Sequence, residues 1–280
     1  MHIFHKISDI KTYLLEQKKK GLQIGFVPTM GALHKGHLTL LEKAKKENDL
    51  CVCSIFVNPI QFNNPTDLSK YPRPIENDIL LLNSISCDIL FQPSVEEMYP
   101  EPNKIIYDFN GLDKTMEGTF RPGHFNGVAV VVKKLFDIIE PNTVYFGEKD
   151  FQQLTIIKYL VKLLQLPIQL IPVETIRESD GLAMSSRNQL LTPDERKAAP
   201  HIYQTLLQAK TTMGFKNIHE LKDWIINEIN RNPFMKIEYF EIVYNDTLQP
   251  VNDLCKSKNS IGCIAVNIGK VRLIDNIKFF

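Results

Sequence analysis

The chain has 280 residues, of which 44% are hydrophobic and 23% charged, as is typical of globular rather than disordered proteins. Its formal net charge of +1 lacks the basic excess that usually accompanies nucleic-acid binding. No apolar stretch approaches the roughly 20 residues needed to cross a bilayer. Five scattered cysteines do not form a disulfide framework, and the charged N-terminal segment is not typical of a signal peptide. We therefore expect a cytoplasmic protein that binds neither membranes nor nucleic acids.

Short apolar segments alternate with amphipathic ones through the first 173 residues. Strands are predicted at 22–27, 51–57, 88–91, 143–146 and 168–173. Helices are predicted at 37–48, 75–83, 125–139 and 152–165, and the segment 93–110, with three prolines, is predicted to be irregular. Alternating strands and helices indicate an α/β fold, with a Rossmann-like parallel sheet and helices on both of its faces.

The pattern changes near residue 174. Helices are predicted at 193–213 and 218–229, followed by strands at 237–244, 261–267 and 271–274. Helices followed by strands favour a smaller α+β unit. We expect a Rossmann-like domain at 1–174 and a smaller α+β C-terminal domain at 175–280.

Polar segments follow three of the predicted strands, at 30–37, 58–62 and 147–153. Ligands of open parallel sheets bind beyond the carboxyl ends of the strands. These three segments are therefore the candidate ligand-binding loops.

The strongest motif is His34-Lys35-Gly36-His37, between a predicted strand and a predicted helix. A helix N-terminus presents unpaired N–H groups that favour phosphate, and two imidazoles three residues apart can face one ligand. Surface histidines and a zinc site are the alternatives. Cys51 and Cys53 could supply further zinc ligands, but their spacing of two on a buried strand favours small core side chains.

Two further polar clusters fit a nucleotide. The first cluster is residues 147–153. In it, Lys149 offers a positive charge for phosphates, and Gln153 can both donate and accept hydrogen bonds. Asp150 could bind the ligand or could simply cap the next helix. The second, residues 184–187, combines two hydroxyls with a guanidinium, although it could be an ordinary surface loop.

Weaker signals come from amides after a strand and from a cation before a helix. Asn58 and Gln61 follow the strand at 51–57, and Arg121 could bind a carboxylate. Either could equally reflect turn chemistry.

Six strings of residues, in order along nearly the whole chain, carry a resemblance. They are Pro28–His34, Ser54–Phe62, Arg121–Phe125, Phe146–Gln153, Asp180–Asn188 and Arg272–Asn276. The chain resembles the His-x-Gly-His nucleotidyltransferase superfamily and, within it, the pantothenate synthetase (pantoate–β-alanine ligase) family.

The resemblance implies ATP-dependent condensation of (R)-pantoate with β-alanine through a pantoyl adenylate. It also implies Mg²⁺ as an ATP partner and a homodimer. The domain at 1–174 would bind nucleotide and pantoate, and the α+β domain at 175–280 would act as a lid. The implied catalytic residues are His37, His34, Lys149 and Arg187. The implied ATP-binding residues are Met30, Gly31, Ala32, Leu33, His34, Lys35, Gly36, His37, Gly147, Glu148, Lys149, Asp150, Ile176, Met184, Ser185, Ser186 and Arg187. Pantoate and β-alanine would contact Gln61, Gln153, Asn58 and Arg121, whereas the resemblance assigns no Mg²⁺ ligands.

Two positions depart from the family pattern. Lys35 stands where an acidic residue is common, and Pro74 stands where threonine is common. We expect the Lys35 side chain to point to solvent. Three alternatives stay open: another nucleotidyltransferase on the same scaffold, an RNA-binding synthetase fragment, and a non-catalytic nucleotide sensor.

Overall fold

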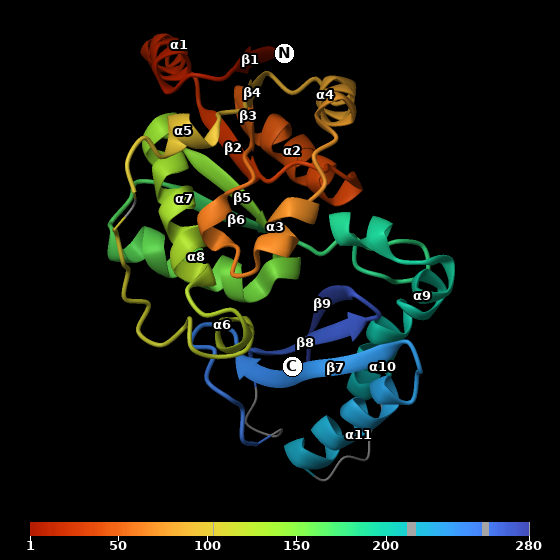
Figure 1. Ribbon diagram of the computed structural model, residues 1–280. Coiled ribbons are helices and arrows are strands. Elements are labelled where there is room, and N and C mark those ends of the chain that lie inside the picture. The colour runs from red at the N-terminus through yellow and green to blue at the C-terminus, as the bar shows by residue number, and fades with distance from the viewer. Residues whose placement is uncertain (103, 212–216, 254–257, 280) are drawn as a thin grey trace. The chain divides into compact units, whose positions relative to one another are not determined.

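The computed structural model describes residues 1–280 except 103, 212–216, 254–257 and 280. The chain divides into two compact units (Figure 1). Unit 1 contains residues 1–148 and 156–174, and unit 2 contains residues 149–155 and 175–280. Along the described chain no helix combines the length and apolar character that a membrane span requires.

Unit 1 is built on a sheet that, in the described residues, has six strands, all paired in parallel. Their order across the sheet is β1-β4-β3-β2-β5-β6. The strands are β1 (His2–Phe4), β2 (Ile24–Thr29), β3 (Leu50–Ile55), β4 (Ile89–Phe91), β5 (Thr143–Gly147) and β6 (Gln169–Val173). The predicted Rossmann-like parallel sheet is thus confirmed.

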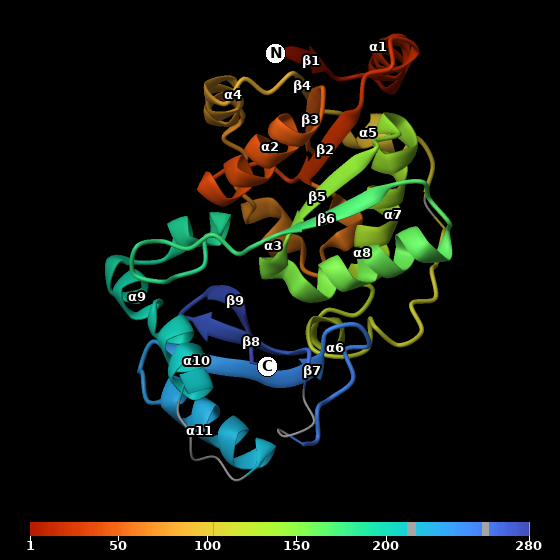
Figure 2. The ribbon, with the colours of Figure 1, turned by 180° about the vertical axis from the view of Figure 1, so that it is seen from behind.

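Helices cover both faces of this sheet. The main ones are α1 (Ile7–Lys19), α2 (Lys35–Glu47), α4 (Ile75–Ser84), α7 (His124–Ile139) and α8 (Phe151–Leu163). Adjacent residues of β2 show the two faces: Val27 packs in a core cluster with Leu41 of α2, and the Phe26 ring meets that of Phe136 on α7, 6.5 Å away. Figures 1 and 2 show α2 and α7 on opposite sides of the strands.

Short elements complete unit 1. They are the 3₁₀ helix η1 (Pro59–Gln61) and the helices α3 (Pro65–Lys70), α5 (Val95–Met98) and α6 (Glu117–Phe120). The 3₁₀ helix η2 (Glu148–Asp150) begins in unit 1 and continues into unit 2. The prediction of irregular structure at 93–110 was therefore wrong at α5, a four-residue helix capped by Ser94. Strand β2 also continues through Pro28 to Thr29. Proline is tolerated there because β5 pairs with β2 only as far as Phe26, so the end of β2 has one neighbour.

Unit 2 packs helices against an antiparallel sheet of order β7-β8-β9. Its strands are β7 (Met235–Tyr244), β8 (Ser260–Ile268) and β9 (Val271–Lys278). Strand β9 is four residues longer than the predicted strand at 271–274. Its helices are η3 (Ser186–Leu190), α9 (Pro193–Ala198), α10 (His201–Thr211) and α11 (Ile218–Asn230). The predicted helix end at 212–213 lies outside the described residues. A separate small antiparallel unit confirms the predicted α+β character of the C-terminal region.

Candidate active site

The loop between β2 and α2 carries the histidine motif, and its backbone is unusually constrained. Gly31 and Ala32 both have left-handed backbones, with φ of 80° and 49°. Such angles are costly for alanine and persist only where the surroundings enforce them. The Thr29 hydroxyl contributes, since it donates to Ser54 O (2.8 Å) and accepts from Gly31 N (3.1 Å).

A buried carboxylate on α4 holds the next two backbone groups of the loop. Asp78 Oδ2 accepts from Ala32 N (2.8 Å), and Asp78 Oδ1 accepts from Leu33 N (2.7 Å). The side chain is only 1% exposed. Its burial raises the pKa of Asp78, and the two backbone hydrogen bonds oppose that rise without cancelling it.

Both motif imidazoles cap the start of α2. His34 Nδ1 accepts from Gly36 N (3.2 Å), and His37 Nδ1 accepts from His34 N (3.3 Å). The rings lie 4.1 Å apart. Because each Nδ1 is an acceptor, the proton of each neutral ring sits on Nε2.

This arrangement corrects two expectations. The N–H groups of His34 and Gly36 are bonded to imidazoles, so the prediction of unpaired N–H groups there was wrong. Helix α2 begins at Lys35 rather than at residue 37, because histidine, not one of the usual capping residues, supplies the cap. The Lys35 side chain is exposed, as expected. The donors that this loop can offer a phosphate therefore include the two Nε2–H groups.

Asn58 and Gln61 lie together after β3. Asn58 Nδ2 donates to Gln61 Oε1 (3.0 Å) and to Gly127 O (3.1 Å), and the Tyr99 hydroxyl donates to Asn58 Oδ1 (2.9 Å). Asn58 is 1% exposed, so its amide faces protein groups. Gln61 Nε2 is directed to Met30, with its nitrogen 3.2 Å from the sulfur. The structure thus brings the amide of Gln61 to the first residue of the histidine loop, and Asn58 fixes its orientation.

Arg121 is linked to this amide pair through His124. Its Nη1 lies 3.2 Å from His124 Nε2, and His124 Nδ1 lies 2.8 Å from Gln61 O. A guanidinium only donates and a carbonyl only accepts, so the proton of the neutral imidazole sits on Nδ1. Arg121 also lies 3.9 Å from Glu117. In this arrangement its guanidinium contacts other protein groups, and through His124 it supports the backbone of Gln61.

In unit 2, a buried ion pair organises the residues around Lys149. Arg177 donates twice to Asp275 (2.6 and 2.9 Å) and stacks 3.5 Å from the centre of the Tyr203 ring. The next residue, Asn276, accepts from Arg177 through its carbonyl (3.3 Å) and donates from Nδ2 to Lys149 O (2.9 Å). A paired, hydrogen-bonded guanidinium–carboxylate contact has defined geometry. The Lys149 backbone is thus fixed to β9.

Two of the predicted ATP-binding segments also adjoin in unit 2. Met184 N donates to Ile176 O (2.9 Å), which joins the segment after β6 to the 184–187 segment. Ser185 Oγ accepts from Arg187 N (3.2 Å) and caps η3, and the Ser186 side chain is buried. The hydroxyl of Ser185 is therefore already used in shaping the turn that presents Arg187.

The remaining predicted positions follow β5. The Lys149 ammonium lies 3.6 Å from the Asp150 carboxylate. Gly147, Glu148 and Gln153 are half-buried. The predicted residues are therefore distributed between both units: 30–37, 58, 61, 121, 147 and 148 in unit 1, and 149, 150, 153, 176 and 184–187 in unit 2.

Cys51 and Cys53 are fully buried in a core cluster with α2, which confirms their predicted role as core side chains. The pKa of Cys51 is raised, first by its hydrogen bond with Cys87 and then by burial. Burial is the main cause of the raised pKa of Cys53. Both are therefore thiols, which are weak metal ligands compared with thiolates.

Comparison with known proteins decides the family. The family model described as pantoate-beta-alanine ligase matches residues 2–278. The chain belongs to the pantoate–β-alanine ligase family. It is 50% identical to a pantothenate synthetase of Azobacteroides pseudotrichonymphae over 280 residues, which is all of both chains. It is 46% identical to one from Porphyromonas gingivalis, over 100% of this chain and 99% of the other.

Solved structures of the same family share the fold. Pantothenate synthetase from Thermus thermophilus superposes with a TM-score of 0.92 at 40% identity, covering 100% of both chains. The pantoate–β-alanine ligase of Francisella tularensis, complexed with β-γ ATP and β-alanine, gives 0.83 at 40% identity, over 99% of this chain and 97% of that one. The predicted family and the prediction of a ligase enzyme are thereby confirmed.

Several residues that hold the predicted segments in place were not singled out from the sequence. Asp78 and Tyr99 lie far along the chain from the loops that they hold, and no local pattern marks them. His124 and Asp275 did occur in the strings shared with the family, although no role was assigned to them. Only the three-dimensional contacts show what these four residues do.

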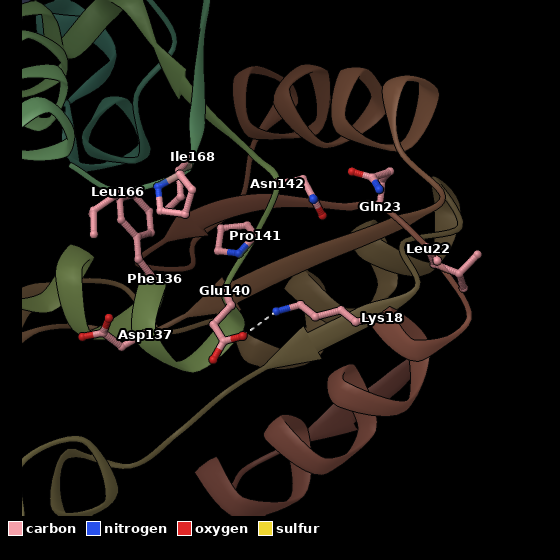
Figure 3. Close-up of a pocket in the computed structure, with 12 residues that line it drawn as sticks. Lys18, Leu22, Gln23, Phe136, Asp137, Glu140, Pro141, Asn142, Leu166 and Ile168 are labelled. Atoms are coloured by element: carbon pink, nitrogen blue, oxygen red, sulfur yellow. Dashed lines mark hydrogen bonds and ion pairs between the residues drawn. The ribbon is translucent and has the colours of Figure 1, made fainter. Parts of the chain in front are cut away.

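A pocket of about 570 Å³ in unit 1 is not part of this site (Figure 3). Gln23, Asn142 and Ile168, which line it, immediately precede or adjoin the amino ends of β2, β5 and β6. Figure 3 shows the Lys18–Glu140 ion pair beside it. The candidate ligand-binding loops of unit 1 follow the carboxyl ends of the strands, so this pocket lies at the opposite, amino ends of the strands.

Proposed function

We propose that the chain condenses (R)-pantoate with β-alanine in two steps, through a pantoyl-adenylate intermediate, and releases pyrophosphate and then AMP. Membership of the ligase family supports the overall reaction. The observation that carries the adenylate step is the pair of imidazoles after β2, each with Nδ1 bonded to the backbone and therefore with Nε2–H as donor.

The first step activates a poor acyl donor. A carboxylate oxygen of pantoate forms a bond to the α-phosphorus of ATP, the bond to the bridging oxygen breaks, and pyrophosphate leaves. Negative charge gathers on the phosphoryl oxygens in the transition state. Donors fixed before the reaction stabilise such charge best, and removing one typically costs ~10²–10³ in rate. We assign this role to the Nε2–H groups of His34 and His37, with His37 the proton donor or charge stabiliser.

We assign phosphate contacts to two cations of unit 2 as well. Lys149 and Arg187 would contact phosphoryl oxygens, with Ile176 lining the adenine pocket. Two backbone contacts support this assignment. Asn276 holds the backbone of Lys149, and Ser185 holds that of Arg187. Only the two long side chains would then lose conformational freedom when the nucleotide binds. We further propose that unit 2 acts as the lid domain, with its boundary near residue 174.

In the second step the amine nitrogen of β-alanine attacks the acyl carbonyl, the bond to AMP breaks, and the amine loses a proton. Gln61 and Gln153 would bind pantoate, and Gln61 would also meet β-alanine. The Asn58 contacts support a fixed Gln61 amide. No covalent protein nucleophile takes part.

Mg²⁺ enters the proposal as part of the nucleotide substrate, where it would neutralise charge on the triphosphate. Among the residues that the structure describes, no three His, Cys, Asp or Glu side chains gather into a metal site. Mg²⁺ often binds through substrate phosphates and one or two carboxylates rather than in an all-protein cage. We therefore assign it no protein ligand and derive no step through it.

We also propose a cytoplasmic homodimer, as the family resemblance implies. Analytical sedimentation of the purified protein tests this proposal, and we expect a mass of about twice the 32.2 kDa of one chain. A monomer at all concentrations would contradict it.

A product assay separates the proposed reaction from the alternatives. With pantoate, β-alanine and ATP, mass spectrometry should detect pantothenate and AMP in equal amounts. A nucleotidyltransferase would instead leave the nucleotide on its product, and a nucleotide sensor would bind ATP without turnover. Either result would overturn the proposal.

A further inference from the structure

The histidine loop depends on a side chain from another part of the chain. Its backbone N–H groups at Gly31 and His34 are bonded within the segment 29–37. Those of Ala32 and Leu33 are bonded to Asp78, 46 and 45 residues away. A buried N–H without an acceptor is costly, and Ala32 already holds an unfavourable φ of 49°. The loop conformation therefore requires an acceptor at this position.

Asp78 is placed to be that acceptor. It lies in the first turn of α4, where the helix N-terminus favours a negative charge. Both of its carboxylate oxygens are used, one on each N–H group, so the contact fixes the loop in direction as well as in position. Asp78 is only 1% exposed, whereas aspartates in the first turn of a helix usually face solvent.

The fit between carboxylate and loop is close. A Cβ atom added at Gly31 would lie 2.9 Å from Ile55 Cγ2, which is closer than real Cβ contacts, and 3.0 Å from Asp78 Oδ2, which is tighter than nine in ten of them. Glycine at 31 therefore serves the close approach of Asp78 as well as the backbone angle. The three residues after Met30 are thus held in place immediately before His34.

We propose that Asp78 is a positioning residue for nucleotide binding: its carboxylate holds the backbone of residues 31–33, and so sets the direction in which the imidazoles of His34 and His37 donate. The inference rests on the proposed function, since it concerns the same phosphate site. Asp78 acts through the backbone, because both of its carboxylate oxygens accept from N–H groups of the loop.

Asp78→Asn tests the proposal with little change in shape. The amide keeps one oxygen acceptor, but its NH₂ group faces the second backbone N–H, donor against donor. We expect the KM for ATP, measured at saturating pantoate, to rise about 10- to 100-fold, because small misplacement of positioning groups has effects of this size. The KM for β-alanine should not change. Partial unfolding, in contrast, would lower kcat and leave the ATP KM of the folded molecules unchanged.

Asp88→Asn is the matched control. Asp88 also accepts from a backbone N–H, that of Cys51 (2.8 Å), and pairs with Lys45, but it lies at the amino ends of β3 and β4. Its replacement should lower the melting temperature without raising the ATP KM. An unchanged ATP KM in Asp78→Asn would overturn the proposal.

Amide hydrogen exchange on the wild-type protein gives a second test that needs no variant. The Ala32 and Leu33 amides should exchange as slowly as those of β2, and fast exchange of both would equally overturn the proposal. A wild-type enzyme that makes no pantothenate would instead contradict the proposed function, so the two failures are distinguishable.

Discussion

Gly127→Ala should impair binding of the acyl substrate by displacing Gln61. Gly127 lies on α7 directly against η1, and an added Cβ would meet Ile60 O at 2.4 Å and Gln61 Cα at 2.8 Å. Real Cβ atoms stay beyond 3.0 Å, so the backbone of η1 must move by at least 0.6 Å (3.0 minus 2.4). The Asn58 contact to Gly127 O would shift with it.

A displacement of this size has a predictable cost. A misplacement of about 1 Å in a positioning group can cost ~10²-fold in rate, so we expect kcat/KM for pantoate to fall about 10- to 100-fold. Overpacking typically destabilises by about 1–3 kcal/mol, which a folded protein of this size survives. Steady-state kinetics with pantoate varied at saturating ATP, together with thermal melting, measure both effects.

Gly25→Ala is the matched control. Its Cβ would meet the Asn48 side chain at 2.5 Å and Ala44 O at 3.2 Å, near the amino end of β2. This variant should melt at a lower temperature and keep its kcat/KM for pantoate. A folded Gly127→Ala enzyme with wild-type kcat/KM for pantoate would refute the role given to the position of Gln61.

Three further predictions concern the proposed role of His37, two core thiols and a partly exposed carboxylate. His37→Ala should slow pyrophosphate release from ATP and pantoate by ~10²–10³ in single-turnover assays, and unaltered release would exclude the charge-stabilising role. Cys51 and Cys53 have raised pKa values, so they should resist alkylation at pH 8 until urea unfolds the protein. Peptide mapping that finds either cysteine modified within minutes in the native protein would contradict their burial. The Glu97 carboxylate accepts a hydrogen bond from Ile7 N, and this bond is the main cause of its lowered pKa. The carboxylate therefore stabilises the fold above its unfolded pKa near 4.5, and this stabilisation is lost as the pH falls through the lower folded pKa. Glu97→Gln should therefore lower the melting temperature more at pH 7 than at pH 3, and an equal loss at both would count against this linkage.

Local pattern predicted most of the parallel sheet. The period of apolar residues and the prolines after strands predicted five of the parallel strands to within a few residues, and the rule that ligands bind at carboxyl ends placed the candidate loops. The edge strand β1 was not predicted, because three partly exposed residues have no distinctive pattern of their own. Their strand conformation comes from pairing with β4.

The internal contacts of the site could not be predicted in the same way. Nothing local to Asp78 indicates that it bonds to Ala32, since the contact exists only once the fold brings α4 against the loop that follows β2. The acceptor role of each imidazole Nδ1 likewise depends on the backbone path after Gly31. Sequence pattern indicated which residue types gather at the site, whereas their donor and acceptor roles follow from the fold.

Activation of pantoate as an adenylate can be followed through its oxygen atoms. Pantoate labelled with ¹⁸O in both carboxylate oxygens is the substrate of choice, because the oxygen that bonds to the α-phosphorus leaves with AMP. We predict one ¹⁸O atom in each AMP and one in each pantothenate amide carbonyl. AMP without ¹⁸O, formed along with pantothenate, would contradict the adenylate.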